Sequence, residues 1–120
     1  MELFTIQLSQ WRIAKQLAIP LLDTTVKTGE KTFSPTWNLV TRIKAGAIDE
    51  NAYRAEYFDI MRQSYVKNTL RWHEVVTMDK VAIACYCPPN CFCHRHLLKE
   101  IFEKVCMRQG LPFLYSGELT

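Results

Sequence analysis

Apolar runs typical of strands alternate along the chain with stretches in which apolar residues recur every three or four positions. The longest strand-like run, VAIACYC at residues 81–87, has no polar interruption and predicts a central strand that is covered on both faces. The other predicted strands are residues 2–8, 17–23 and 111–115. Residues 10–16 suit a short helical connection between the first two strands.

Helical periodicity occupies the middle of the chain and the segment before the last strand. Residues 36–46, 49–65 and 70–76 carry the first three amphipathic patterns, with Asp49 as a candidate N-cap. Residues 94–110 show the clearest helical stripe, which consists of Leu97, Leu98, Ile101, Phe102 and Val105. Because strand, helix and strand in this order imply a parallel crossover, the predicted fold class is α/β: a small three-layer Rossmann-like sandwich with a mostly parallel sheet.

The bulk composition is that of one globular domain spanning residues 1–120, with 48% hydrophobic and 22% charged residues. The net charge of +3 is spread along the chain, so no nucleic-acid polymer is expected as a partner. No apolar run approaches the ~20 residues of a membrane span, and residues 1–15 lack a signal-peptide pattern. We therefore expect a cytoplasmic protein with no membrane partner.

The segment CYCPPNCFCHRHLL, residues 85–98, concentrates the candidate chemistry. It follows the central strand, and ligands of open parallel sheets bind beyond the carboxyl ends of the strands. Arg95 falls in the first turn of the predicted helix, where a positive charge is disfavoured unless an anion is near. This placement predicts a phosphate or carboxylate held by Arg95 and the backbone N–H groups of residues 93–95. The alternative is an ion pair of Arg95 with Asp23 or Glu118.

The cysteines of this segment allow three interpretations. Cys93 or Cys87 could be a nucleophile with His94 as its base, since a helix N-terminus lowers a thiol pKa. Zinc could be held by Cys87, Cys91, Cys93 and His94, although the spacing lacks the two separated pairs typical of zinc sites. In the third interpretation Cys85 and Cys106 are small core residues and the others line a rigid loop.

Two further groups are candidates for ligand contact. The polar loop of residues 24–35 offers hydroxyls, charge and an aromatic ring, and the helical middle offers tyrosines that could stack on a base. The candidates are Asp23, Thr24, Thr25, Lys27, Lys31, Phe33, Tyr57 and Tyr65. A solvated loop and ordinary core aromatics are the alternatives.

The chain resembles the DUF488 family, especially its short phage-type members. The features that carry the resemblance are Cys93-His94-Arg95 opening the last helix, Leu22-Asp23 followed by Thr24-Thr25, the stretch 33–37, the helix 57–65, and Tyr115-Ser116-Gly117-Glu118. Larger members often have an arginine soon after the aspartate, where this chain has Thr25. The resemblance implies a Rossmann-like sandwich with a pocket around Asp23, Thr25 and the Cys93-His94-Arg95 turn. The family has no accepted common activity.

Small phage proteins with nucleotide-sized pockets include sponges that sequester immune signalling nucleotides, such as cyclic oligonucleotides and ADP-ribose derivatives. By this analogy, the first functional hypothesis is a non-catalytic binder of a phosphate-bearing, nucleotide-like small molecule, active in the host cytoplasm if phage-encoded. We expect no cofactor, and a homodimer that encloses the ligand. The rival hypotheses are a cysteine-dependent nucleotide hydrolase or transferase and a zinc-stabilised interaction module.

Overall fold

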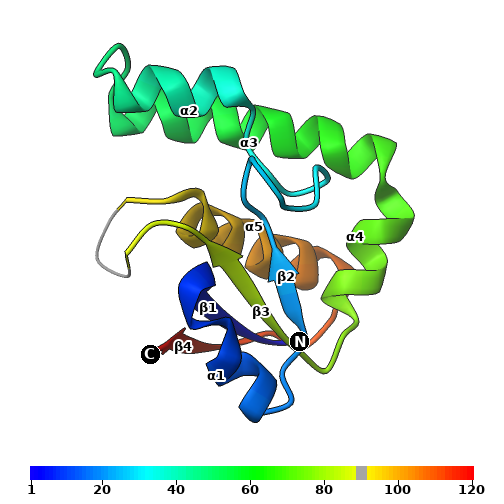
Figure 1. Cartoon of the computed structure of the whole chain (residues 1–120). Helices are drawn as coiled ribbons and strands as arrows, with labels where there is room; N and C mark the ends of the chain where they lie inside the picture. The colour runs from blue at the N-terminus through cyan, green and yellow to red at the C-terminus, as the bar shows by residue number, and fades with distance from the viewer. Residues whose placement is uncertain (89–91) are drawn as a thin grey trace.

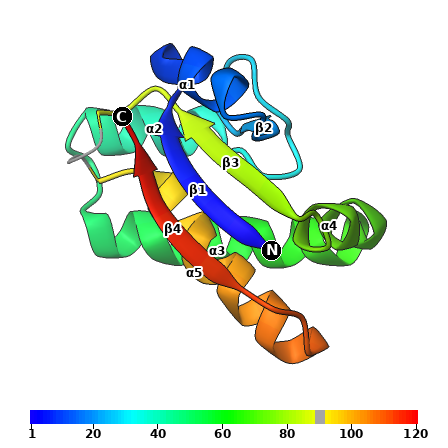
Figure 2. The same ribbon diagram turned by 90° about the horizontal axis from the view of Figure 1, so that it is seen from below.

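The computed structural model describes residues 1–88 and 92–120 and contains a four-stranded sheet in the order β2-β3-β1-β4 (Figures 1 and 2). The strands are β1 Glu2–Gln7, β2 Leu21–Asp23, β3 Lys80–Cys85 and β4 Leu114–Leu119. All three pairings are parallel. Residues 81–85 of β3 are buried, which confirms the central, doubly covered strand that the unbroken apolar run predicts.

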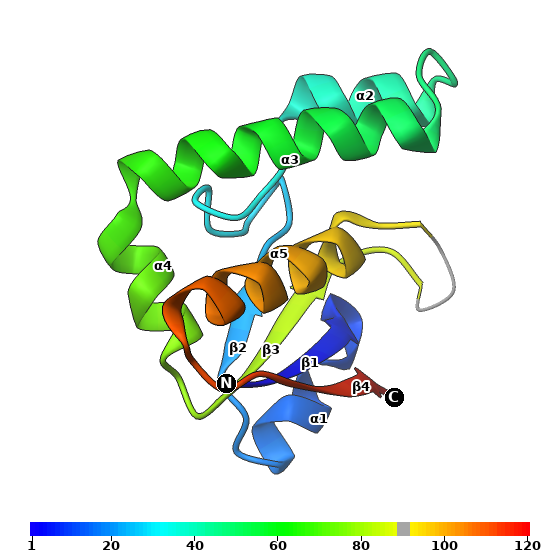
Figure 3. The same ribbon diagram turned by 180° about the vertical axis from the view of Figure 1, so that it is seen from behind.

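Helices cover both faces of the sheet (Figures 1 and 3). The helical elements are the 3-10 turn η1 Leu8–Gln10 and the helices α1 Trp11–Gln16, α2 Trp37–Lys44, α3 Glu50–Lys67, α4 Thr69–Val76 and α5 His94–Gln109. On one face Ala82 and Ala84 pack with Ala14 of α1. On the other face Val81 and Ile83 join a larger core with α3, α4 and α5. The fold is the α/β, Rossmann-like three-layer sandwich that the sequence predicts.

Helix boundaries follow the capping residues. Asp49 accepts a hydrogen bond from the Ala52 N–H at the start of α3, as predicted, and Thr36 caps α2 by accepting from the Leu39 N–H. Gly110 follows α5 with a φ of 68°, the left-handed conformation that glycine adopts most readily. Cys93 precedes α5 and makes no side-chain cap. The first turn of α5 therefore lacks the usual side-chain acceptor.

Two strand predictions are wrong in their boundaries. The second strand is confined to Leu21–Asp23, because α1 runs into a turn through Leu17 and Ala18, whose φ is 56°. The last strand spans Leu114–Leu119 instead of residues 111–115. Pro112 has no N–H to give to a ladder, and its carbonyl accepts a bond from the Met1 ammonium instead. The chain therefore joins the sheet only beyond this point.

Among the helices that the structure describes, none combines the length and the apolar character needed to cross a membrane.

Candidate functional site

A cavity of about 250 Å³ opens at the carboxyl ends of β2 and β3, beside the N-terminus of α5 and beneath α2 and α3. We call it the cysteine cavity. Its described lining residues are Thr25, Val26, Pro35, Val40, Ile43, Lys44, Tyr53, Cys85, Tyr86, Cys87, Phe92, Cys93 and His94. The ends of parallel strands are where an open α/β sheet places its ligands, so the fold itself supports this location.

His94 is held in one orientation by the residue that follows β2. Its Nε2 lies 2.8 Å from the Thr24 carbonyl oxygen and 3.0 Å from the Thr24 hydroxyl, which itself donates to the Ala84 carbonyl. A carbonyl only accepts, so Nε2 carries the proton. Burial lowers the pKa of His94 to about 4, more than the Thr24 carbonyl raises it. The imidazole is therefore neutral at pH 7, with an unprotonated Nδ1.

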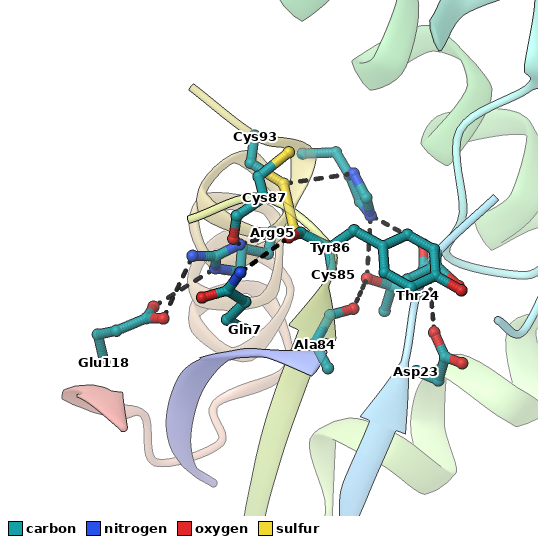
Figure 4. The surroundings of a disulfide bond; sticks show 12 residues. Gln7, Asp23, Thr24, Ala84, Cys85, Tyr86, Cys87, Cys93, Arg95 and Glu118 are labelled. Carbon is teal, nitrogen blue, oxygen red and sulfur yellow. Dashed lines mark hydrogen bonds and ion pairs between the residues drawn. A yellow bond between two sulfur atoms is a disulfide. The ribbon is translucent and has the colours of Figure 1, made fainter. Parts of the chain in front are cut away.

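This unprotonated nitrogen faces the sulfur of Cys93. The distance from His94 Nδ1 to Cys93 Sγ is 3.7 Å, which allows an S–H···N hydrogen bond when Cys93 is reduced (Figure 4). Cys93 is buried and immediately precedes the 16-residue helix α5, whose positive dipole end favours a thiolate. The pair has the parts of an activated nucleophile: a thiol, an adjacent base and a third group that orients the base.

Cys85 completes a sulfur pair with Cys93. Their Sγ atoms are joined as a disulfide (Figure 4), yet their Cα atoms lie 7.7 Å apart, beyond the ~4.4–6.8 Å that is usual for a disulfide. The backbone thus suits two adjacent thiols better than a permanent cross-link. Cys85 was predicted as a core residue; it is buried, but it also lines the cavity.

Arg95 is fully buried, is not among the described lining residues, and points toward Glu118 (Figure 4). Its guanidinium pairs with Glu118, with Nη2 to Oε2 at 3.2 Å, and Nη1 donates to Cys85 Sγ at 2.7 Å and to the Cys87 carbonyl at 2.8 Å. The alternative prediction of a local ion pair with Glu118 is confirmed. The pair accounts for a positive charge in the first turn of α5 without any external anion.

A metal ion has one candidate set of ligands among the described residues. Cys85 Sγ, Cys93 Sγ and His94 Nδ1 lie within 4.8 Å of one another. Two thiolates and an imidazole suit zinc, and the Nε2–H bond to Thr24 is the outer contact usual for a metal-bound histidine. This set differs from the predicted one: Cys85 is included and Cys87 is not, while Cys91 lies outside the described residues.

The loop of residues 24–35 contributes little to the cavity beyond Thr25, Val26 and Pro35. Asp23 accepts bonds from the Thr25 N–H and the Thr28 hydroxyl, and so shapes the turn. An added Cβ at Gly29 would meet the Thr25 nitrogen at 2.4 Å, so the turn admits only glycine there. Lys27 and Lys31 are exposed and do not line the cavity.

The three aromatic residues proposed from the sequence are not among the lining residues of the cavity, although the Tyr57 ring lies 5.6 Å from that of His94. Phe33 is buried between the rings of Trp72 and Phe102, and the hydroxyl of buried Tyr57 donates to the Phe33 carbonyl. Half-buried Tyr65 packs its ring 5.6 Å from that of Trp72 and lines a different hollow. These three residues support the core and the helical layer.

Several lining residues escaped sequence reasoning, among them Tyr53 and Lys44, which have polar groups that a ligand could use. Tyr53 stands in the first turns of α3, its ring 5.3 Å from that of Phe92, and burial raises its pKa so that the phenol stays protonated. Lys44 is the one lysine or arginine among the described lining residues. The sequence signal for Tyr53 was its position four residues after the N-cap Asp49. Tyr53 and Lys44 reach the cavity only because α2 and α3 pack over the strand ends, which the sequence does not reveal.

The fold and site define a Rossmann-like α/β domain with a thiol and imidazole centre at the strand ends. A family model described as "Active DUF488-N3 subclade" matches residues 8–105. The chain therefore belongs to the DUF488 family. No curated protein and no solved structure matches it in the corresponding comparisons.

Proposed function

We propose that this protein is a cysteine-dependent enzyme, a hydrolase or transferase, that acts on a small nucleotide-like molecule in the cysteine cavity. The single observation that carries the proposal is the placement of Cys93 Sγ 3.7 Å from the Nδ1 of a buried histidine whose Nε2–H is fixed on Thr24. A buried neutral imidazole in this orientation serves as a general base at pH 7.

The proposed reaction proceeds through an adduct on sulfur. His94 Nδ1 takes the Cys93 proton, and the thiolate attacks an electrophilic carbon or phosphorus of the substrate. The new S–C or S–P bond replaces the bond to the leaving group, which takes the proton from the imidazolium. Water or a second acceptor then displaces the sulfur and restores the thiol, with His94 again moving the proton.

The walls of the cavity limit the substrate. A volume of about 250 Å³ is below the ~300–1,000 Å³ of most ligand sites, so it suits one ring system or one end of a nucleotide. Tyr53 and Phe92 supply flat apolar contact, and Lys44 stands on the lining to meet a phosphate. The word "Active" in the description of the matched subclade supports catalysis over mere binding.

A second candidate is a non-catalytic sponge for a phosphate-bearing nucleotide, acting in phage counter-defence as a homodimer. Its support is the predominantly apolar lining of the cavity, with Lys44 available for a phosphate, since burial of a ring needs no reactive group. This candidate requires a ligand that leaves the protein chemically unchanged.

The test incubates the reduced protein with a panel of nucleotides, cyclic dinucleotides and ADP-ribose derivatives, and follows each compound by mass spectrometry. The wild type should consume at least one compound over many turnovers, and Cys93→Ser should lose that activity by about 10³-fold or more. Cys106→Ala is the matched control, because Cys106 of α5 is buried in the hydrophobic core and is not among the described lining residues of the cavity. Stoichiometric binding of an unchanged compound would establish the sponge instead.

A further inference from the structure

A second and larger hollow, of about 680 Å³, lies on the helical side of the molecule. It runs between α3 and α5 and is closed at one end by α4, and these three helices are seen together in Figure 3. We call it the α3–α5 groove. None of its described lining residues belongs to the cysteine cavity.

The floor of the α3–α5 groove is apolar and continues onto exposed side chains. Buried Met61 and Trp72 form its deepest part, and half-buried Phe58 lies at its side. At its edge, Val66 of α3 is 77% exposed and Met107 of α5 is 75% exposed. A floor and two edges of this kind present continuous apolar surface to water, which is the usual mark of an interaction surface.

The rim of the groove is positively charged on both sides. Arg62 stands on α3, and Lys104 and Arg108 stand one turn apart on α5. No acidic residue is among the described residues that line it. Asp59 lies 4.0 Å from Arg62, but both side chains are largely exposed, so this pair offsets little of the charge.

We propose that the α3–α5 groove binds an acidic amphipathic helix of a partner protein. Two neighbouring helices form a groove into which the apolar face of a third helix can pack, as in other helix-in-groove complexes. Glutamates or aspartates on both sides of that stripe would meet Arg62 on one rim and the two α5 cations on the other. This inference stands independently of the proposed enzymatic function.

A helix fits these observations better than a small anionic molecule does. The cations stand on opposite rims with the apolar floor between them, which matches a helix that carries acidic residues along both sides of its apolar stripe. Val66 and Met107 lie at the edges, where a helix would cover them and a small ligand buried on Trp72 would leave them in water.

The test uses two fluorescein-labelled peptides of about five helical turns (~18 residues). One has a leucine stripe flanked by glutamates on both sides, and the other has lysine in place of every glutamate. Fluorescence anisotropy should show that the acidic peptide binds with micromolar affinity and at least ~10-fold more tightly than the basic one, with affinity falling as salt rises.

Variants locate the binding. Lys104→Glu/Arg108→Glu should weaken the affinity for the acidic peptide by more than ~10-fold. The double variant Arg12→Glu/Lys15→Glu is the matched control, since it makes the same charge change on exposed residues of α1, across the sheet, and should change affinity by less than ~2-fold. Cys93→Ser should bind the peptide like the wild type, so failure of the enzyme proposal and failure of this one are distinguishable.

Three results would overturn the inference. Equal binding of the two peptides would remove the charge argument, and unchanged affinity in Lys104→Glu/Arg108→Glu would place the site elsewhere. Sedimentation that shows a dimer dissociated by Val66→Asp would assign the groove to a second copy of this chain. AMP that quenches tryptophan fluorescence in the wild type but not in the α5 double variant, with no peptide binding, would assign it to a nucleotide.

Discussion

The cysteine cavity and the α3–α5 groove recognise ligands by opposite means. Beside the cavity, Arg95 is the one buried arginine or lysine among the described residues, and it already pairs with Glu118 and donates to Cys85. The reactive groups of the cavity itself are a neutral imidazole and thiols. In the groove the cations are exposed on the rim, where the weak Arg62–Asp59 pair and the contact of Lys104 with the Phe58 ring leave them accessible to an acidic partner. The difference teaches that a charged residue in the sequence indicates a ligand site only when no buried group of the protein already neutralises its charge.

The strongest test of this comparison removes the buried cation. Arg95→Met should lower the free energy of unfolding by about 3 kcal/mol, because Glu118 and the Cys87 carbonyl lose a partner inside the protein. Urea unfolding measures the change. Arg42→Met, which breaks a partly exposed pair with Glu56, is the control and should cost below about 1 kcal/mol. Equal losses in the two variants would refute a structural role for the buried pair.

The neutral state of His94 predicts a pH dependence of stability. The pKa of His94 is lowered on folding from 6.5 to about 4, so its contribution is complete above pH 6.5 and is lost as the pH falls toward 4. The difference in unfolding free energy between wild type and His94→Gln should therefore shrink by about 3 kcal/mol over that window. A constant difference would mean that His94 is charged in the native state.

The sulfur pair predicts inhibition by zinc. Cys85, Cys93 and His94 should bind Zn²⁺ with loss of turnover that a chelator reverses, and Cys85→Ala should weaken the binding by about 10–100-fold. Isothermal titration with zinc measures the affinity. If Zn²⁺ instead raised turnover, the metal and not the thiol would be the reactive group.

The smallest expected effect is a change in KM that distinguishes the lysine lining the cysteine cavity from the lysines of the loop of residues 24–35. Lys44→Ala should raise KM for a phosphate-bearing substrate by about tenfold, or ~1.4 kcal/mol, because Lys44 alone among the described lysines and arginines lines the cavity. Lys27→Ala and Lys31→Ala should change KM by less than about twofold. Steady-state kinetics would contradict the assigned cavity if a loop lysine had the larger effect.

Sequence patterns predicted the elements whose signals are local. The apolar run of β3, the stripe of α5 and the cap at Asp49 all depend on residues close in the chain, and they lie where expected. The location of the site at the strand ends followed from the same reasoning, because parallel strands share one carboxyl edge.

What the sequence could not resolve depends on contacts between distant segments. Arg95 had two possible carboxylates, and only the path of β4 brings Glu118 beside it. The polar loop of residues 24–35 was predicted to contact a ligand, but its Glu30 pairs with Arg71 on α4 and its Phe33 is buried in the core. Cys85 meets Cys93 because the N-terminus of α5 lies beside the carboxyl end of β3, a packing that no spacing rule predicts.

The activation of the Cys93 thiol by His94 can be tested directly, without a substrate. The reduced protein is treated with limiting iodoacetamide at several pH values, and alkylation of each cysteine is followed by peptide mass spectrometry. Cys93 should react as a thiolate at pH values well below ~8.5, the pKa of an ordinary cysteine thiol, despite its burial. His94→Gln should slow this reaction. Faster alkylation of the more exposed Cys87, with Cys93 inert in both proteins, would contradict it.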